Sequence, residues 1–110
     1  MPYRAPVEDF AFLFDHVVGL DAVRQTDRFE DASEDVTRAI LEEAGKMTND
    51  VLAPLQRAGA QTPAKLENGV VRTPTGFKEA FDKVKEGGWP GLDMPEEYGG
   101  QNMPYVLNTA

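Results

Sequence analysis

The sequence of 110 residues predicts an all-α fold: a small helical bundle, with at most a short hairpin near residues 65–72. Apolar residues recur at helical spacing near 7–18, 32–57 and 76–86. Glycine and proline separate these stretches, and only the connection after the second one carries a strand signal. A chain of this length has room for one domain.

The first apolar stripe follows an extended arm, residues 1–6, in which prolines disfavour helix. The stripe repeats at i, i+3, i+4 and i+7, through Phe10, Leu13, Phe14 and Val17. Gly19 is expected to end this helix, and residues 20–29 carry a short helical turn at most. Phe12 lies on the opposite side, as a scattered exposed aromatic or as a contact for another part of the protein.

The second stripe is the longest in the chain. Asp31 and Glu34 have the spacing of a capping box and predict the start of the helix. The apolar positions are Val36, Ile40, Ala44, Met47, Val51 and Leu55. Pro54 predicts a kink or an end nearby, and Gly59 is expected to be the left-handed residue that closes the helix.

The hairpin signal is Asn68-Gly69 between two short apolar runs. Thr75 is predicted to cap the third helix, which Gly87-Gly88 should stop. Pro104 fits the first turn of a further helix. The residues expected to dominate the core are Phe10, Leu13, Phe14, Ile40, Met47, Val51, Phe77, Phe81 and Trp89.

The composition excludes several classes of partner. A net charge of −8 disfavours nucleic acid and anionic membrane surfaces, which require basic patches. The absence of cysteine excludes disulfides and thiolate metal sites. No apolar run is long enough to span a membrane, and the first residues do not have the pattern of a targeting peptide, so we expect a cytoplasmic protein.

Residue chemistry by itself indicates no active site. His16 is the single histidine and is placed on the polar side of the first helix, near Phe12, as a solvated side chain. Glu42 and Glu43 are interpreted as part of a solvated face. No phosphate-binding glycine motif follows a strand, and Gly99-Gly100 is better explained as a tight turn.

The densest sequence signal is the segment 87–104. It places five glycines and three prolines around Trp89 and Tyr98, as expected for a shaped connection between helices. Its motif, Glu-Gly-Gly-Trp followed by Pro-Glu-Glu-Tyr-Gly-Gly and Met-Pro, resembles the N-terminal helical domain of the flavin-dependent acyl-CoA dehydrogenases. The resemblance covers nearly the whole chain. The opening residues 3–13 are similar to an extension in large bacterial members that resemble 3-methylthiopropanoyl-CoA dehydrogenase.

The resemblance implies a longer enzyme that uses FAD to form the α,β double bond of an acyl-CoA and passes electrons to an acceptor. The flavin contacts and the glutamate base of the family lie in later domains. We therefore expect no catalytic, cofactor-binding or metal-binding residue here. What carries over is a structural turn formed by Trp89, Pro95, Tyr98, Gly99 and Gly100. Asn102 departs from the family, in which a small residue, often glycine, is common.

The resemblance also predicts the organisation of the chain: an N-terminal extension, residues 1–30, and a main helical part, residues 31–110, that is truncated. We expect the chain alone to be inactive and to shape part of the approach to the acyl pocket. The alternatives are a free-standing helical interaction module without catalysis and an unrelated acidic helical protein. We also expect a homo-oligomer, with association through the aromatic residues Phe12, Trp89, Tyr98 and Tyr105.

Overall fold

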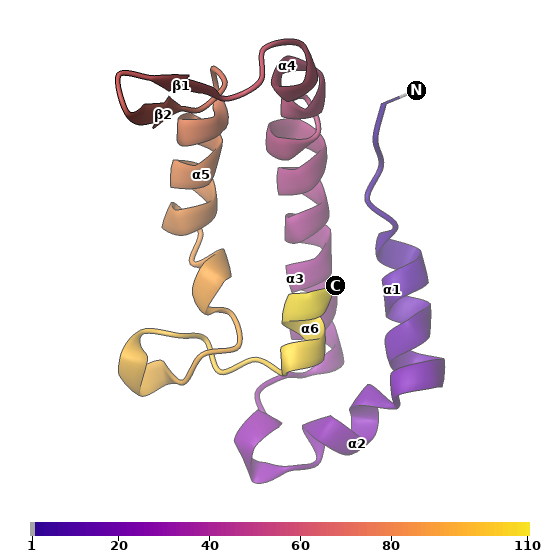
Figure 1. Ribbon diagram of the computed structural model, residues 1–110. Helices are drawn as coiled ribbons and strands as arrows, with labels where there is room; N and C mark the ends of the chain where they lie inside the picture. Colours follow the sequence, from indigo (N-terminus) through magenta and orange to yellow (C-terminus); the bar gives the residue numbers. More distant parts are fainter. Residues whose placement is uncertain (1) are drawn as a thin grey trace.

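The computed structural model describes residues 2–110 and confirms a helical fold with one short hairpin. Three helices carry most of it: α1 (Val7–Leu13), α3 (Glu34–Met47) and α5 (Phe77–Glu86). Shorter helices connect or follow them: α2 (Leu20–Arg24), α4 (Leu55–Gln61) and α6 (Tyr105–Thr109). Figure 1 places α2 at one end of the molecule and the hairpin, β1 (Lys65–Glu67) and β2 (Val70–Arg72), at the other. No helix within residues 2–110 is long and apolar enough to cross a membrane.

The first helix has the predicted extent. A π-helical turn, Phe14–Val18, continues α1, and Gly19 ends the helix with a φ of +68°. The following residues form only the short α2 and one 3-10 turn, Asp27–Phe29, as predicted. Arg24 fastens α2 to the start of α3, because its guanidinium donates to the Ala32 carbonyl at 2.8 Å and to the Thr37 hydroxyl at 2.9 Å.

The predicted caps of the second helix are wrong. Ser33, not Asp31, caps α3: its hydroxyl accepts the Val36 N–H at 3.3 Å. Serine stands next to the first helical residue, where a short hydroxyl side chain reaches a free N–H, whereas Asp31 lies two residues too early. Gly59 lies inside α4 instead of closing it. A Cβ at Gly59 would come within 2.8 Å of the Phe77 ring, so this glycine permits close packing.

The break at Pro54 is confirmed. A π-helical turn, Thr48–Leu52, extends α3, and α4 begins directly after Pro54. The hairpin is also confirmed: Asn68 and Gly69 have φ of +50° and +75°, and Lys65, Leu66 and Glu67 pair with Arg72, Val71 and Val70. Two successive positive φ values are what a two-residue hairpin turn requires.

The predicted cap of the third helix is wrong as well. Gly76, with a φ of +90°, precedes α5, and no side chain caps that end. A Cβ at Gly76 would meet a Leu55 methyl at 2.8 Å, so the helix starts where the chain passes closest to α4. Gly88, with a φ of +74°, ends the helical segment as predicted, and Pro104 is buried directly before α6.

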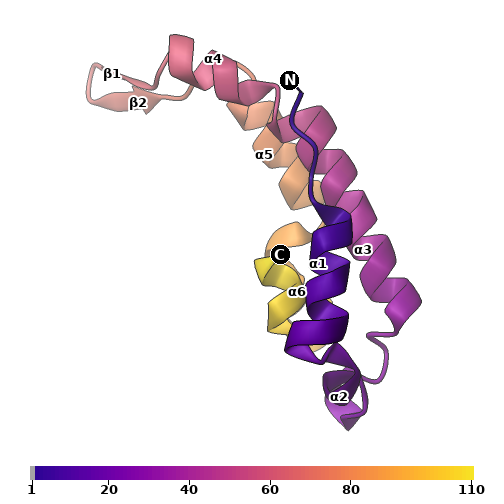
Figure 2. The same ribbon diagram turned by 90° about the vertical axis from the view of Figure 1, so that its right-hand side faces the viewer.

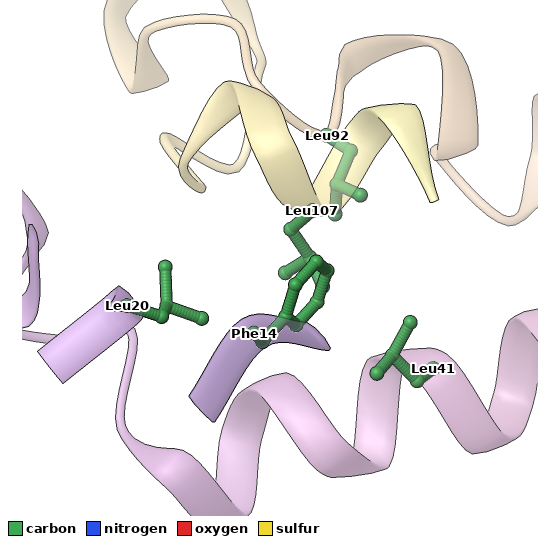
Figure 3. Close-up of a cluster of buried hydrophobic side chains, with 5 residues drawn as sticks. All are labelled: Phe14, Leu20, Leu41, Leu92 and Leu107. Carbon is green, nitrogen blue, oxygen red and sulfur yellow. The ribbon is translucent and has the colours of Figure 1, made fainter. Parts of the chain in front are cut away.

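The core lies where α1, α2 and α3 meet the end of the chain. Figure 3 shows its five side chains, with Phe14 between Leu107 and Leu41. The core residues are Phe14, Leu20, Leu41, Leu92 and Leu107. Phe10 and Ile40 pack at its border. Residues 7–24 therefore share one core with α3 and with the segment that follows Leu92.

The predicted core list is partly wrong. Leu13, Phe77 and Phe81 are exposed, with Phe81 at 61%. Met47, Val51 and Trp89 are half-buried. An apolar stripe identifies the face that can be buried, but no element covers the outer side of α5 within the part of the chain that the structure describes. Phe12 is exposed at 61%, and its ring lies 4.7 Å from the His16 ring, centroid to centroid, on the polar side as predicted.

Candidate functional site

The segment 88–104 is a closed loop held by its own backbone. After the 3-10 turn Trp89–Gly91, the chain leaves and returns beside itself. Three amides on the return path donate to carbonyls on the outward path: Gln101 to Gly91 at 3.0 Å, Asn102 to Met94 at 2.8 Å, and Met103 to Leu92 at 2.9 Å. These bonds pair backbone N–H and C=O groups of the loop with one another, and they bring Leu92 and Met103 side by side at the core.

The two adjacent glycines of the loop serve different purposes. Gly99 has a φ of +83°, which side-chain-bearing residues rarely adopt, and nothing lies within 4 Å of the position where its Cβ would be. Gly100 is constrained by space. A Cβ there would lie 2.1 Å from the Met94 carbonyl oxygen and would break the return path. Closure of the loop therefore requires glycine at position 100 and favours it at position 99.

The other predicted turn residues occupy separate places in the loop. Trp89 is half-buried, and its indole nitrogen packs against Gly87, where a Cβ would come within 2.6 Å. Pro95 has extended backbone, with ψ of 146°, and starts the second 3-10 turn, Glu96–Tyr98. Tyr98 points outward and is 78% exposed. The five residues belong to one loop, but they do not converge on a common point.

Asn102 shows how the loop accommodates its departure from the family pattern. Its φ is +52°, a left-handed conformation that glycine adopts freely and asparagine tolerates better than most residues. Its side-chain amide donates to the Arg28 carbonyl at 3.0 Å and so fastens the loop to the segment after α2. A glycine would keep the conformation but would lose this bond.

Two apolar hollows border the helices, and sequence analysis did not predict either. One, of about 180 Å³, lies between the first helix and α6 and is lined by Phe10, Leu13, Phe14, Val18, Val106, Thr109 and Ala110. The other, of about 310 Å³, lies between the end of α3, α4 and α5 and is lined by Leu52, Leu55, Gln56, Phe77, Ala80, Phe81 and Val84. The residues wrongly expected in the core, Leu13, Phe77 and Phe81, are among the residues that line these hollows.

The ionisable groups form surface ion pairs. The Glu42 and Glu8 carboxylates raise the pKa of the Arg38 guanidinium, chiefly by accepting its hydrogen bonds. In the same way Glu43 raises the pKa of Lys46, while hydrogen bonds from Lys78 and Lys85 lower the pKa of Asp82. All these groups are solvent-accessible, and residues 2–110 hold no cluster of His, Asp and Glu suited to a metal ion. We find no acid–base pair at either hollow.

Comparison with known proteins finds two relatives of this chain, both of them acyl-CoA dehydrogenases. Over all of its 110 residues it is 37% identical to 3-methylmercaptopropionyl-CoA dehydrogenase of Ruegeria pomeroyi, and it covers 19% of that protein. Over 107 residues, or 96% of the chain, it is 28% identical to the broad-specificity linear acyl-CoA dehydrogenase FadE5 of Mycobacterium tuberculosis, of which it covers 18%. The curated homologues of this chain are acyl-CoA dehydrogenases. No family model matches.

The chain spans about a fifth of the length of these acyl-CoA dehydrogenases. Its resemblance to their family, inferred above from the loop and its flanking helices, is confirmed by the two relatives. An FAD molecule does not fit the hollows described above. A flavin needs a flat apolar slot together with donors to its polar edge and phosphates, and the apolar hollows offer almost no polar group. We therefore derive no chemical step through a flavin.

Proposed function

We propose that this chain is the N-terminal helical domain of an FAD-dependent acyl-CoA dehydrogenase, which forms the α,β double bond of an acyl-CoA. The observation that supports this proposal most strongly is the 37% identity to the Ruegeria enzyme, which extends over the whole chain but covers only 19% of that enzyme. Such a match fits a domain of a longer enzyme. The glycine-dependent loop at residues 88–104, which the resemblance singles out, supports the same proposal.

In this proposal the chain contributes scaffold and not chemistry. The base, the flavin contacts and the site for the electron acceptor belong to later domains, and residues 1–30 are an N-terminal extension of the main part, 31–110. Trp89, Pro95, Tyr98, Gly99 and Gly100 hold the loop that leads toward the acyl pocket. The two apolar hollows are surfaces on which further domains pack, since exposed apolar patches of this kind mark contact sites. The longer enzyme is a cytoplasmic homo-oligomer.

A chimera tests this scaffold role. Residues 1–110 replace the matching segment of the Ruegeria enzyme, and flavin content and dehydrogenase turnover are measured. We expect the chimera to retain both, and we expect a second chimera that carries Gly100→Ala to lose flavin and turnover together. The matched control is Lys83→Gln, at an exposed position of α5. A well-folded chimera that binds flavin equally well with and without Gly100→Ala would contradict the role of the loop.

The chain by itself provides a second test. Purified residues 1–110 should bind no flavin tightly and should not oxidise butanoyl-CoA or 3-methylthiopropanoyl-CoA with an artificial acceptor. A bound yellow chromophore or measurable turnover would contradict the proposal that the chemistry lies outside this chain. The alternative, a free-standing interaction module, predicts that the chimera neither folds stably nor turns over substrate, whereas the proposed domain supports both.

A further inference from the structure

One end of the molecule has the opposite charge to the rest. Residues 55–78 carry four cations, Arg57, Lys65, Arg72 and Lys78, and one carboxylate, Glu67, in a chain whose net charge is −8. Lys78 is paired with Asp82 at 2.7 Å, which leaves the other three cations against one carboxylate. Residues 55–78 comprise α4, the hairpin and the start of α5. Figures 1 and 2 show them together at the end of the molecule that lies farthest from α2. This end is therefore the part of the surface where an anion is attracted.

Two of these cations face each other across the hairpin. Lys65 on β1 is directly opposite Arg72 on β2. Like charges in directly opposite positions destabilise a strand pair. Neither side chain takes part in an ion pair among residues 2–110. The hairpin thus holds two positive charges close together, neither of them in an ion pair, with Glu67 as its one carboxylate, and a bound anion would relieve their repulsion.

The pair borders a polar hollow of about 280 Å³. Lys65 and Arg72 line it together with the hydroxyl-bearing residues Thr62, Thr73 and Thr75 and two prolines. No carboxylate lines it. The Thr62 hydroxyl donates to the Ala58 carbonyl at 2.8 Å, which fixes that side chain at the end of α4. Each proline fixes one φ, so the two connections that carry the threonines have fewer conformations to lose on binding.

We propose that this hollow is a binding site for a phosphate group. A guanidinium and an ammonium together match a dianion, and the planar fork of Arg72 suits two phosphate oxygens. The hydroxyls of Thr73 and Thr75, which also line the hollow, can donate to further oxygens. A long polyanion is disfavoured, because the acidic remainder of the chain repels it. The ligand is either free inorganic phosphate or the terminal phosphate of a larger molecule, and the same chemistry recognises both.

Titration with sodium phosphate near pH 7.5, against sodium chloride at equal ionic strength, tests the site. Amide NMR signals of the 110-residue chain report binding. We expect saturable shifts at Thr62, Thr73 and Thr75 with phosphate only. Arg72→Gln should weaken binding roughly five-fold, in line with the loss of one solvent-exposed ion pair. The matched control, Lys83→Gln on α5, should bind as the unmodified chain does.

A charge reversal separates binding from simple loss of structure. Lys65→Glu places opposite charges across the hairpin, so we expect it to protect the hairpin amides from exchange in the absence of phosphate and to abolish the phosphate shifts. Shifts of equal size in chloride, or unchanged phosphate affinity in both Arg72→Gln and Lys65→Glu, would overturn the proposal.

Two nucleoside probes distinguish the sources of the phosphate. Adenosine 5′-monophosphate and inorganic phosphate are compared, with adenosine as the control. Tighter binding of the nucleotide supports a larger phosphorylated ligand, and equal binding supports the free anion. Equal shifts with adenosine and with its monophosphate would show that the phosphate is not recognised and would overturn the proposal.

Discussion

The two ends of the molecule use their apolar residues in opposite ways. At the α2 end, Phe14 is 5% exposed and Leu107 is 3% exposed. At the hairpin end, Leu66 is 73% exposed and Phe81 is 61% exposed. Segments from both halves of the sequence meet around Phe14, whereas no element among residues 2–110 packs on the hairpin or on the outer face of α5. Burial is decided by how many segments converge, not by the hydrophobicity of one stripe.

The largest expected effect of a single substitution is at the buried end. Phe14→Ala should lower the free energy of unfolding by roughly 3–5 kcal/mol, because it removes a ring from the centre of the core and leaves a cavity. Urea denaturation followed by circular dichroism measures this loss. A decrease below about 1 kcal/mol would show that the five-residue core does not hold the fold together.

The loop that delivers Leu92 and Leu107 to this core should be the next most sensitive region. Gly100→Ala should lower the free energy of unfolding by roughly 1–3 kcal/mol, since the added methyl overlaps the Met94 carbonyl and the backbone has to move. Gly99→Ala is the comparison at the adjacent residue. It should have a smaller effect, about 1–2 kcal/mol, because only the left-handed φ opposes it. A larger loss of stability for Gly99→Ala than for Gly100→Ala would contradict the conclusion that a steric overlap constrains Gly100 and a left-handed φ constrains Gly99.

At the exposed end the same kind of truncation should matter little. The sequence placed Phe81 in the core, and removing a buried ring there would lower the free energy of unfolding by roughly 3–5 kcal/mol. Because the ring is exposed, we now expect less than about 1 kcal/mol in the 110-residue chain. In a chimera with the longer relative the effect should grow if another domain covers α5. Equal, small effects in both proteins would show that this face stays open.

The smallest expected effect comes from the charge pairs on α5. Hydrogen bonds from Lys78 and Lys85 lower the pKa of Asp82 in the folded chain. Its contribution to stability is therefore present above the unfolded carboxyl pKa, about 3.9, and is lost as the pH falls through the lower folded value. Thermal melts of the unmodified chain and of Asp82→Asn should differ slightly at pH 7 and converge near pH 2. A difference in melting temperature between the two proteins that does not change with pH would show that the charge of Asp82 is not its cause.

Local signals were predicted well from the sequence. The hairpin turn at Asn68-Gly69, the helix end at Gly19 and the break at Pro54 depend on residues a few positions apart, and the structure confirms all three. The caps at Asp31 and Thr75 were wrong by one or two residues. Ser33 stands closer to the start of α3 than Asp31 does, and the close approach of Gly76 to Leu55 sets the start of α5 without a side-chain cap.

Long-range packing was harder to predict. Leu92 and Leu107 lie in short segments without helical periodicity, so nothing local marks them as core residues. The turn residues of the candidate site were recognised from the sequence. The steric constraint on Gly100, unlike the conformational one on Gly99, could not be predicted, because it depends on where the Met94 carbonyl lies. The polar hollow beside Lys65 and Arg72 was likewise not predictable, because it depends on how the connections that carry Thr62 and Thr75 lie beside the hairpin.

The bond from Asn102 to the Arg28 carbonyl joins residues 74 positions apart, and the core joins Phe14 to Leu107 over a still longer stretch. During synthesis, α1, α2 and α3 leave the ribosome long before their partners. Until Leu92 and Leu107 emerge, Phe14, Leu20 and Leu41 have no apolar cover on one side. Non-local contacts of this kind slow folding and leave the growing chain open to aggregation. Folding of the nascent chain therefore depends on the segment around Leu107, and a ribosome that stalls before Leu107 would present an unfinished core to chaperones and proteases.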